Sequence, residues 1–286
     1  MKKPAFLRNL KITQLKLAVA KVLYLAVRIF FRKPRYIVTR QGVRLELDLN
    51  EGIDLHLFLF GNFQKHVTDN SLISLPVNGV VLDVGGNAGV MSLIFASKVP
   101  YGQVHAFEPT DYAMVKFRRN LEFNPSLQPL ITLNQNFVAS RESENPGMTA
   151  YSSWPVLGKQ EKHAIHCGVD KTTPDIPAIT LDAYCIRHKL SRVDLVKIDT
   201  DGYEMDVLSG ASNILKQYRP QVIFEIGGYV MEEYGLSMST YLQFFREHGY
   251  SLYTTKGKRV DEGCYIDIVP VFGTTDLVAL PENVGD

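Results

Sequence analysis

An acidic residue and a glycine-rich loop stand together at the end of one short apolar segment. Residues 80–84 (VVLDV) contain Asp83 and run into residues 85–89 (GGNAG), after which a helical segment begins at Val90. Glycine lets the backbone turn sharply and lets a ligand approach without a Cβ in the way. A buried strand that leads into such a loop and a helix is how open α/β sheets bind nucleoside cofactors. The segment therefore predicts a nucleoside-cofactor crevice and leaves the cofactor open.

Three further carboxylates stand at the ends of predicted strands. They are Glu108, Asp199 and Glu225. Ligands of such sheets bind beyond the carboxyl ends of the strands, so we expect these side chains to surround one crevice. Glu108 follows Asp83 by 25 residues, one βαβ unit, where a carboxylate can accept hydrogen bonds from both hydroxyls of a ribose. The alternative for any single acid is that it caps a helix or is solvated in a loop.

Two classes of cofactor compete for this crevice. A dinucleotide requires the pattern G-x-G-x-x-G, so that its pyrophosphate rests on a helix N-terminus. Residues 85–89 do not have that spacing. S-adenosylmethionine has no phosphate; it has a ribose, an adenine, a cationic sulfonium and an amino-acid tail. An acid before the loop, an open glycine bend and a second acid for the ribose suit S-adenosylmethionine better.

The rest of the pattern predicts one large α/β domain with an N-terminal attachment. Strand-like and helical segments alternate from residue 79 onwards, which predicts a mainly parallel sheet with helices on both faces. The predicted strands are 80–84, 103–107, 131–133, 193–198, 221–225, 250–254 and 266–272, and the helices between them are 91–98, 112–123, 205–215 and 241–248. The predicted domains are a helical segment at 1–35, a hairpin and helix cap at 36–78, and the sheet domain at 79–286 with an insertion at about 140–178.

Residues 11–33 have the pattern of a basic amphipathic helix that ends at Pro34. One face holds Gln14, Lys21, Arg28 and Arg32, and the opposite face holds Leu15, Val19, Val22, Leu23, Ala26 and Phe30. Lys21 and Arg28 interrupt the apolar run, so the segment is a poor spanning helix. No cleavage site of a secretory signal follows. Such a helix either packs on the domain or on a second copy in a homodimer, or makes peripheral contact with an anionic membrane surface.

The composition favours a globular protein in a reducing compartment. With 286 residues, 45% of them hydrophobic, the chain is long enough for one sizeable core. A net charge of +1 gives no global field that would attract nucleic acid. Cys167, Cys185 and Cys264 form no C-x-x-C pair, which argues against a disulfide framework and a zinc site. We therefore expect a cytoplasmic protein, or one at the inner face of a membrane, with no nucleic-acid partner.

Several motifs resemble those of one enzyme family. Residues 83–89 (DVGGNAG) resemble the D-V-G-A-N-x-G loop of FkbM-type S-adenosylmethionine-dependent methyltransferases, and residues 106–109 (AFEP) resemble their A-F-E-P. The motifs that follow in the family's order are 180–182 (TLD), 193–204 (VDLVKIDTDGYE) and 207–211 (VLSGA). The agreement covers about residues 50–255. Two positions depart from the pattern: Gly86 stands for an alanine, which should only loosen the loop, and Asp201 stands for a glutamate, which retracts a carboxylate by one methylene.

The resemblance implies a class I methyltransferase fold, a Rossmann-like, seven-stranded, mostly parallel twisted sheet whose last strand is antiparallel. It implies S-adenosylmethionine as the cofactor and O-methylation of a sugar, a glycan or glycolipid, or a natural product. By the same resemblance Asp83, Gly85, Asn87 and Gly89 hold the methionine part, Glu108 holds the ribose and Asn136 lies near the adenine; Gly86, Pro109 and Asp199 complete the predicted cofactor-binding residues.

Methyl transfer to an alcohol requires the acceptor oxygen, the carbon and the sulfur in line, and a base near the hydroxyl proton assists it. Asp199 is the predicted base, because it closes the fourth strand beside the expected position of the methyl group; the alternative is that it only orients Lys197 or the following turn. His56, His163 and His166 are alternative candidate bases outside the sheet. Asp199, Asp201 and Glu204 resemble a metal-binding cluster, but Glu204 is predicted to begin a helix and no calcium loop is present, so we expect no metal.

The predicted insertion at 140–178 is the expected acceptor side, because loops after the strand ends form that side of such sheets. It contains Tyr151, Trp154, His163 and His166, and the predicted substrate-binding residues are Trp154, His166, Asp201 and Glu225. Aromatic faces combined with a few polar groups commonly bind sugars. The alternative is a surface loop with a small hydrophobic cluster of its own.

Two other functions are compatible with the sequence. An NAD-dependent nucleotide-sugar oxidoreductase or epimerase needs a Tyr-x-x-x-Lys pair; Tyr112 and Lys116 have that spacing, but they follow the second strand, where such a pair is not expected. A non-catalytic, membrane-associated module on a methyltransferase scaffold is the other alternative, because a fold alone does not settle function.

Overall fold

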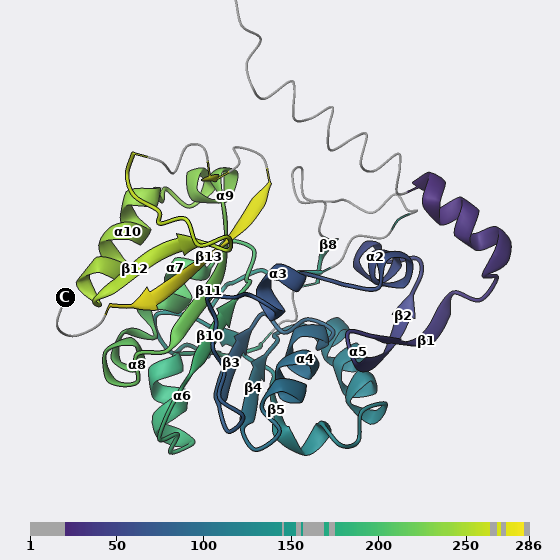
Figure 1. Ribbon diagram of the computed structural model, residues 1–286, viewed down its shortest axis with the longest axis horizontal. Coiled ribbons are helices and arrows are strands. Elements are labelled where there is room, and N and C mark those ends of the chain that lie inside the picture. The colour runs from purple at the N-terminus through teal and green to yellow at the C-terminus, as the bar shows by residue number, and fades with distance from the viewer. Residues whose placement is uncertain are drawn as a thin grey trace, which may run out of the picture.

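The computed structural model of the protein describes residues 21–144, 146–152, 156, 169–171, 175–263, 268–269 and 273–282 (Figure 1). The first described element is a helix over residues 21–30, called here the N-terminal helix. It is followed by a hairpin of β1 (Arg35–Arg40) and β2 (Val43–Asp48), and by the helices α2 (Gly52–Phe60) and α3 (Lys65–Thr68). The hairpin predicted at 36–49 is thus present.

Strands and helices then alternate through the sheet domain. The first half consists of β3 (Val80–Val84), α4 (Val90–Lys98), β4 (Gln103–Phe107), α5 (Asp111–Glu122), a 3-10 helix (Gln128–Leu130), β5 (Ile131–Asn134), β6 (Phe137–Val138), β7 (Tyr151–Ser152), β8 (Val169–Asp170) and β9 (Ala178–Ile179). The second half consists of α6 (Leu181–Arg187), β10 (Leu195–Ile198), α7 (Glu204–Ser209), α8 (Ser212–Gln217), β11 (Gln221–Gly227), α9 (Gly228–Glu233), α10 (Met238–Glu247), β12 (Tyr250–Thr254) and β13 (Thr274–Pro281).

Seven strands form the central sheet in the order β12-β13-β11-β10-β3-β4-β5. The strands from β11 to β5 pair in parallel, whereas β13 is antiparallel to both β11 and β12. The predicted mostly parallel sheet with an antiparallel last strand is therefore confirmed. The order of the strands reverses between β3 and β10, so the carboxyl ends of these two strands form the switch point where open α/β sheets bind ligands.

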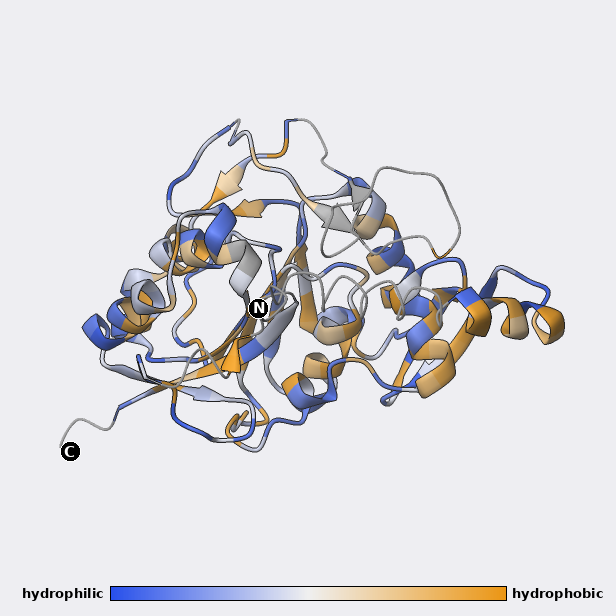
Figure 2. Ribbon diagram, turned by 90° about the horizontal axis from the view of Figure 1, so that it is seen from above, coloured by the Kyte–Doolittle hydropathy of each residue, from blue (hydrophilic) through white to orange (hydrophobic). Residues whose placement is uncertain are grey.

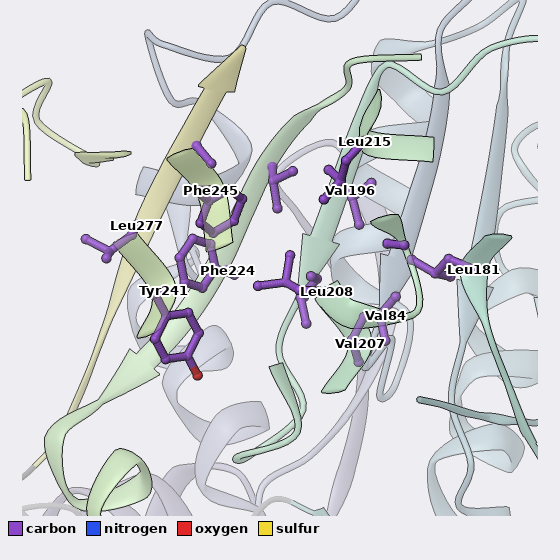
Figure 3. Close-up of a cluster of buried hydrophobic side chains, with 14 of the residues drawn as sticks. Val84, Leu181, Val196, Val207, Leu208, Leu215, Phe224, Tyr241, Phe245 and Leu277 are labelled. Carbon is purple, nitrogen blue, oxygen red and sulfur yellow. The ribbon is translucent and has the colours of Figure 1, made fainter. Parts of the chain in front are cut away.

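Both faces of the sheet are buried. On one face, Phe224 of β11 stacks on Tyr241 and Phe245 of α10, with ring centroids 5.7 and 5.3 Å apart (Figure 3). Leu82 of β3 belongs to this cluster, whereas its neighbour Val81 belongs to the cluster on the other face, under α4. Successive side chains of a strand point to opposite faces. Burial on both faces explains why the central strands are nearly continuous apolar runs.

The hairpin docks at the end of α5 through two buried amide side chains, Asn120 of the helix and Asn124 just after it. Asn124 bonds both backbone groups of Arg44, accepting from the N–H at 2.9 Å and donating to the carbonyl oxygen at 2.7 Å. Asn120 accepts from the backbone N–H of Glu46 at 2.9 Å and donates to the carbonyl oxygen of Ala88 in the glycine loop at 2.8 Å. The two amides thus satisfy an open edge of β2 and tie it to the loop between β3 and α4.

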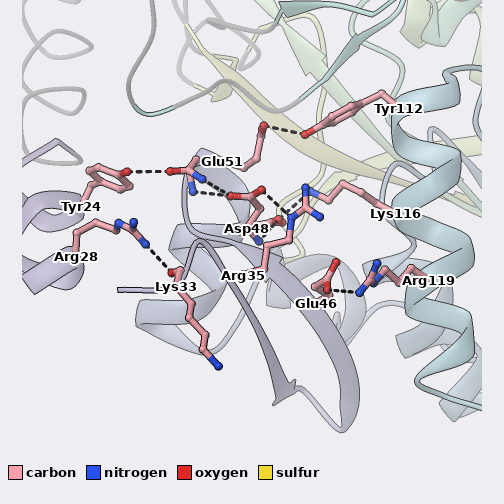
Figure 4. A network of polar contacts seen from close by, with 12 residues as sticks. Tyr24, Arg28, Lys33, Arg35, Glu46, Asp48, Glu51, Tyr112, Lys116 and Arg119 are labelled. Atoms are coloured by element: carbon pink, nitrogen blue, oxygen red, sulfur yellow. Dashed lines mark hydrogen bonds and ion pairs between the residues drawn. The ribbon is translucent and has the colours of Figure 1, made fainter. Parts of the chain in front are cut away.

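Polar contacts also join the hairpin region to the start of α5 (Figure 4). The hydroxyl of Tyr112 donates to Glu51 at 2.8 Å, and Lys116 forms an ion pair with the buried Asp54 at 2.8 Å. Burial and the nearby Glu51 carboxylate raise the pKa of Tyr112. These contacts fix the N-terminal segment beside the loop that carries Glu108.

Two predicted elements are corrected. The last strand of the sheet is Thr274–Pro281, which pairs with both β11 and β12; of the predicted range 266–272 only residues 268–269 are described, and they are not in a strand. The single helix predicted at 205–215 is two helices, α7 and α8, which are separated at Gly210. A Cβ at Gly210 would lie 2.1 Å from the carbonyl oxygen of Ala139, so the chain passes there only with glycine.

Candidate functional site

The loop between β3 and α4 is shaped by close contacts that require glycine. At Gly85, where φ is 77°, a Cβ would lie 1.8 Å from the carbonyl oxygen of Asp199 at the end of β10. At Gly89, where φ is 83°, a Cβ would lie 2.3 Å from the ring of Phe117. A Cβ at Gly86 would lie 3.2 Å from the same ring. Gly86 therefore does more than loosen the loop, because an alanine there would press on Phe117.

The carboxylate of Glu108 holds this loop from the neighbouring strand. One oxygen, Oε1, accepts hydrogen bonds from the N–H and the hydroxyl of Thr110, at 2.9 and 2.6 Å. The other, Oε2, accepts from the N–H of Asn87 at 2.9 Å. Burial raises the pKa of Glu108, while these hydrogen bonds lower it. A carboxylate has about four acceptor positions, so Oε2 has room for one more donor.

A buried cation connects the loop to β10. Lys197 lies 3.3 Å from Oδ1 of Asp83 and 3.6 Å from Oδ2 of Asp199, and its ammonium donates to the carbonyl oxygen of Gly85 at 3.1 Å. Burial lowers the pKa of Lys197, but attraction to the two aspartates outweighs it and the pKa is raised. The second oxygen of Asp83 accepts from the hydroxyl of Ser92 at 2.5 Å. Lys197 is therefore a charged core residue that fixes the positions of both aspartates.

The turn after β10 is organised by Glu204, the first residue of α7. Its Oε1 accepts from the N–H of Thr200 at 3.0 Å, from the hydroxyl of Thr200 at 3.0 Å and from the N–H of Gly202 at 3.1 Å. Burial raises the pKa of Glu204. Asp201, between these residues, adopts a left-handed φ of 53°. The hydrogen bonds of the Glu204 carboxylate thus hold the backbone of the turn in place. This turn fixes the backbone conformation of Asp201.

One pocket opens at the switch point between β3 and β10. Of the sequence-predicted site residues it is lined by Gly85, Glu108, Pro109, Asn136, Asp199 and Asp201. Its apolar walls come from Val84, Phe107, Phe137, Val138 and Met148, and Thr149, Ala150, Thr200 and Tyr203 complete it. The pocket therefore combines an apolar slot with three carboxylates, two of them on the β10 side.

The protonation of Asp201, which lines the pocket, is strongly altered. Burial, together with the negative charges of Asp199 and Glu204, raises the pKa of Asp201 from 3.8 to about 7. A buried acid near like charges retains its proton more strongly because its ionised form is destabilised. Asp201 is thus poised to exchange a proton near neutral pH.

Comparison with known proteins decides the class of this site. A profile of the methyltransferase FkbM domain matches residues 83–252, more than half of the chain. The chain belongs to the FkbM methyltransferase family. The matched part of the chain is a methyltransferase domain whose methyl donor is S-adenosylmethionine, so the predictions of family, enzyme class and cofactor are confirmed.

Curated relatives are distant and match only part of the chain. Methyltransferase 1 of Beauveria bassiana (strain ARSEF 2860) is 28% identical over 150 residues, which are 47% of this chain and 59% of that protein. Methyltransferase sdnD of Sordaria araneosa is 28% identical over 173 residues, 52% of this chain and 65% of that protein. The chain thus spans about three fifths of the length of these relatives. A crystal structure of an FkbM methyltransferase from Methylobacillus flagellatus KT aligns with a TM-score of 0.46 and 14% identity, covering 73% of this chain and 45% of that chain.

The residues of the pocket fit S-adenosylmethionine. The free acceptor position on Glu108 suits a ribose hydroxyl, and the apolar walls suit an adenine. Asp199 places negative charge on the β10 side, which suits a cationic sulfonium or the ammonium of the amino-acid tail. The competing oxidoreductase prediction is wrong, because the chain belongs to a methyltransferase family and Tyr112 and Lys116 bond Glu51 and Asp54 instead.

Several predicted site residues lie away from the pocket lining. Asp83 is fully buried beneath the loop, so it positions Lys197 and Ser92 rather than facing a ligand. Gly86, Asn87 and Gly89 shape the loop without lining the pocket, Glu225 accepts from Thr274 at 2.6 Å outside it, and His56 is exposed on α2 with its ring 4.8 Å from that of Phe60. Trp154, His163 and His166 lie outside the described residues.

Sequence reasoning missed two parts of the site. The first is Lys197, which the sequence analysis did not include among the site residues. A lysine inside an apolar strand, close to an aspartate, indicates a buried ion pair. Tyr203 and residues 148–150 also line the pocket. The N–H of Thr149 donates to the hydroxyl of Tyr203 at 3.2 Å, which joins the insertion to the turn after β10. No sequence signal reveals that long-range contact.

Replacing Glu108 with glutamine tests the pocket assignment directly. An amide NH₂ would face either the N–H of Asn87 or the two donors of Thr110, so at least one hydrogen bond becomes a repulsive contact. We expect the affinity for S-adenosylhomocysteine to fall by about 10- to 100-fold, since hydrogen bonds to charged groups contribute about 1.5–3 kcal/mol. Isothermal titration calorimetry measures this affinity. The control is Glu122→Gln, the same change at an exposed residue at the end of α5. Equal affinity in both variants would contradict the assignment.

Proposed function

We propose that the protein transfers the methyl group of S-adenosylmethionine to a hydroxyl of a sugar, a glycan or glycolipid, or a natural product. The observation that carries this proposal is the convergence of Glu108, Asp199 and Asp201 on one pocket in an FkbM-family methyltransferase. Glu108 binds the cofactor, while the two aspartates follow β10, on the other side of β3, and line the pocket together with residues 148–150 of the insertion. A carboxylate at this place can accept the proton that the acceptor hydroxyl loses during methyl transfer.

S-adenosylmethionine supplies an electrophilic methyl carbon, to which the acceptor oxygen bonds as the carbon–sulfur bond breaks and sulfur retains the electron pair. The loop at Gly85, held against Asp199, keeps the backbone of β3 and β10 in one arrangement and so fixes the cofactor side of the pocket. Orientation of this kind contributes much of the rate of a displacement between two bound reactants. The remaining requirement is a group that accepts the hydroxyl proton.

Asp201 meets this requirement better than Asp199, the base that the sequence predicts. Asp199 is already paired with Lys197 at 3.6 Å. For Asp201, burial and the negative charges of Asp199 and Glu204 outweigh the attraction of Lys197, and its pKa is raised to about 7. A general base is most effective when its pKa lies near the working pH. We therefore assign Asp201 as the base and Asp199 as the group that, with Lys197, positions the turn.

The pH dependence of the reaction follows from this assignment. Asp201 acts in its ionised form, so kcat/KM should rise about tenfold per pH unit below its pKa and level off above it. With a pKa of about 7, the midpoint is expected near neutrality. A steady-state profile of methyl transfer between acidic and alkaline pH measures this. A profile that is flat through neutral pH would show that Asp201 is not the base.

Two experiments test the function itself. Calorimetry with S-adenosylhomocysteine and with NADH should detect binding of the first ligand and not of the second. A screen of hydroxyl-bearing sugars, glycolipids and natural products, with the mass increase of one methyl group as readout, should then identify the acceptor class. Binding of S-adenosylhomocysteine without transfer to any acceptor would favour a non-catalytic module instead.

A further inference from the structure

The N-terminal helix is held to the body of the protein by one face. Tyr24 and Val27 are buried and pack in one cluster with Leu55 of α2 and with Val156. The hydroxyl of Tyr24 donates to Oδ1 of Asn50 at 2.8 Å (Figure 4). These contacts set the rotation of the helix about its axis, and they determine which side chains face away from the protein.

The face that points away is apolar. It consists of Val22, Leu25, Ala26, Ile29 and Phe30, a helical i, i+3, i+4, i+7, i+8 stripe. The side chains are widely exposed, with 66% for Val22, 57% for Leu25, 70% for Ile29 and 81% for Phe30. The helix stands at the margin of the molecule in Figure 1 and is largely coloured as hydrophobic at the right edge of Figure 2. Single exposed apolar residues are ordinary, but a contiguous exposed stripe marks an interaction site.

The charge around this stripe is uniformly positive. The first 45 residues contain 12 of the 31 Lys and Arg of the chain and none of its 30 Asp and Glu. The remaining residues therefore hold 19 Lys and Arg against 30 Asp and Glu. Lys21, Arg32 and Lys33 are exposed at the two ends of the helix. The net charge of the whole chain is near zero because the positive charge of its first 45 residues offsets the negative charge of the rest.

We propose that the outward face of the N-terminal helix docks on a bilayer that contains anionic lipids. The apolar stripe would enter the boundary between headgroups and acyl chains, and the flanking Lys and Arg would contact phosphates. The acidic body would be repelled by the same surface, which orients the protein. Among the described helices, none has the length and hydropathy of a membrane span.

A second copy of the chain fits this face less well. Symmetric pairing of two N-terminal helices would bring Lys21, Arg32 and Lys33 of both copies together. The other large exposed hydrophobic side chains of the described body, such as Tyr101, Val115 and Ile186, come from separate elements. Because they come from separate elements, these three side chains do not form an apolar stripe on which the N-terminal helix of a second copy could pack.

Sedimentation of the full chain with lipid vesicles tests the proposal. The protein should bind vesicles of phosphatidylcholine mixed with phosphatidylglycerol, bind vesicles of phosphatidylcholine alone weakly, and be released as the salt concentration is raised. The variant Ile29→Ser/Phe30→Ser should reduce the partition coefficient by about 100-fold, because two apolar side chains no longer leave water. The variant Arg32→Glu/Lys33→Glu should abolish the preference for anionic vesicles.

Two matched controls accompany these variants. Ile186→Ser removes an isoleucine that is 76% exposed on α6, and Lys216→Glu reverses an exposed charge on α8; both should bind vesicles as the wild type does. Calorimetry with S-adenosylhomocysteine should give unchanged affinity for every variant, which shows that each is folded and separates this test from that of the reaction. The proposal is overturned if Ile29→Ser/Phe30→Ser binds vesicles like the wild type. It is also overturned if that variant converts a dimer into a monomer while the wild type ignores anionic vesicles.

Discussion

Asp201→Asn is expected to lower kcat by about 10²- to 10⁴-fold, the usual contribution of a positioned general base. Asparagine has nearly the same shape as aspartate and tolerates the left-handed φ of 53° at this position. The substitution therefore removes the proton acceptor and leaves the turn after β10 in place. Affinity for S-adenosylhomocysteine should be retained, because its sulfur is neutral and does not depend on the carboxylate charge. Single-turnover rates and calorimetry measure the two quantities separately.

The matched control for this substitution is Asp175→Asn. Asp175 is also an aspartate with a positive φ, 64°, but it is exposed and does not line the pocket. It should leave kcat unchanged. Asp199→Asn provides the second comparison, because it alters the partner of Lys197. A larger loss of kcat in Asp199→Asn than in Asp201→Asn would return the role of base to Asp199.

The same substitution should change how stability depends on pH. The pKa of Asp201 is raised from 3.8 to about 7, so between these values the native state holds a proton that the unfolded state has released. Stability therefore decreases as pH rises through this window. Asp201→Asn lacks that dependence, so its Tm relative to the wild type should be higher at pH 8 than at pH 4. Loss of activity combined with a gain in Tm would distinguish a catalytic role from a structural one.

Lys197→Met is expected to lower the free energy of unfolding by about 3–5 kcal/mol, since removing one partner of a buried ion pair leaves an uncompensated charge. Asp83 is fully buried and would lose its cation, and the carbonyl oxygen of Gly85 would lose its donor. Methionine retains the length and apolar stem of lysine, so little of the loss would come from packing. Urea denaturation followed by fluorescence measures the change.

Lys216→Met is the control for this prediction, because Lys216 is exposed on α8. It should change the free energy of unfolding by less than about 0.5 kcal/mol, as surface substitutions usually do. The double variant Asp83→Asn/Lys197→Met should recover part of the loss, because the uncompensated carboxylate is then absent. A loss of less than about 1 kcal/mol in Lys197→Met would mean that the ion pairs with Lys197 contribute little.

Local sequence features were sufficient for the elements that lead to the site. The apolar run at 80–84 followed by glycines predicts the strand, the loop and the helix that the structure contains, because burial on both faces and positive φ both restrict residue type. The last strand was misplaced, because residues 266–272 have the composition of a strand, whereas it is Thr274–Pro281 that pairs with both β11 and β12. Local pattern does not report which strand lies in the middle of a sheet.

The sequence alone determined the family, the sheet and the set of carboxylates at the strand ends, since these depend on residue type and spacing along the chain. Tertiary structure decided the roles within that set. In the structure, Glu108 accepts a hydrogen bond from the glycine-rich loop, and Asp83 and Asp199 form ion pairs with Lys197. Asp201 is the group with a pKa near neutrality. The physical reason is that protonation and hydrogen bonding depend on burial and on charges a few ångströms away, which come from residues distant in the chain.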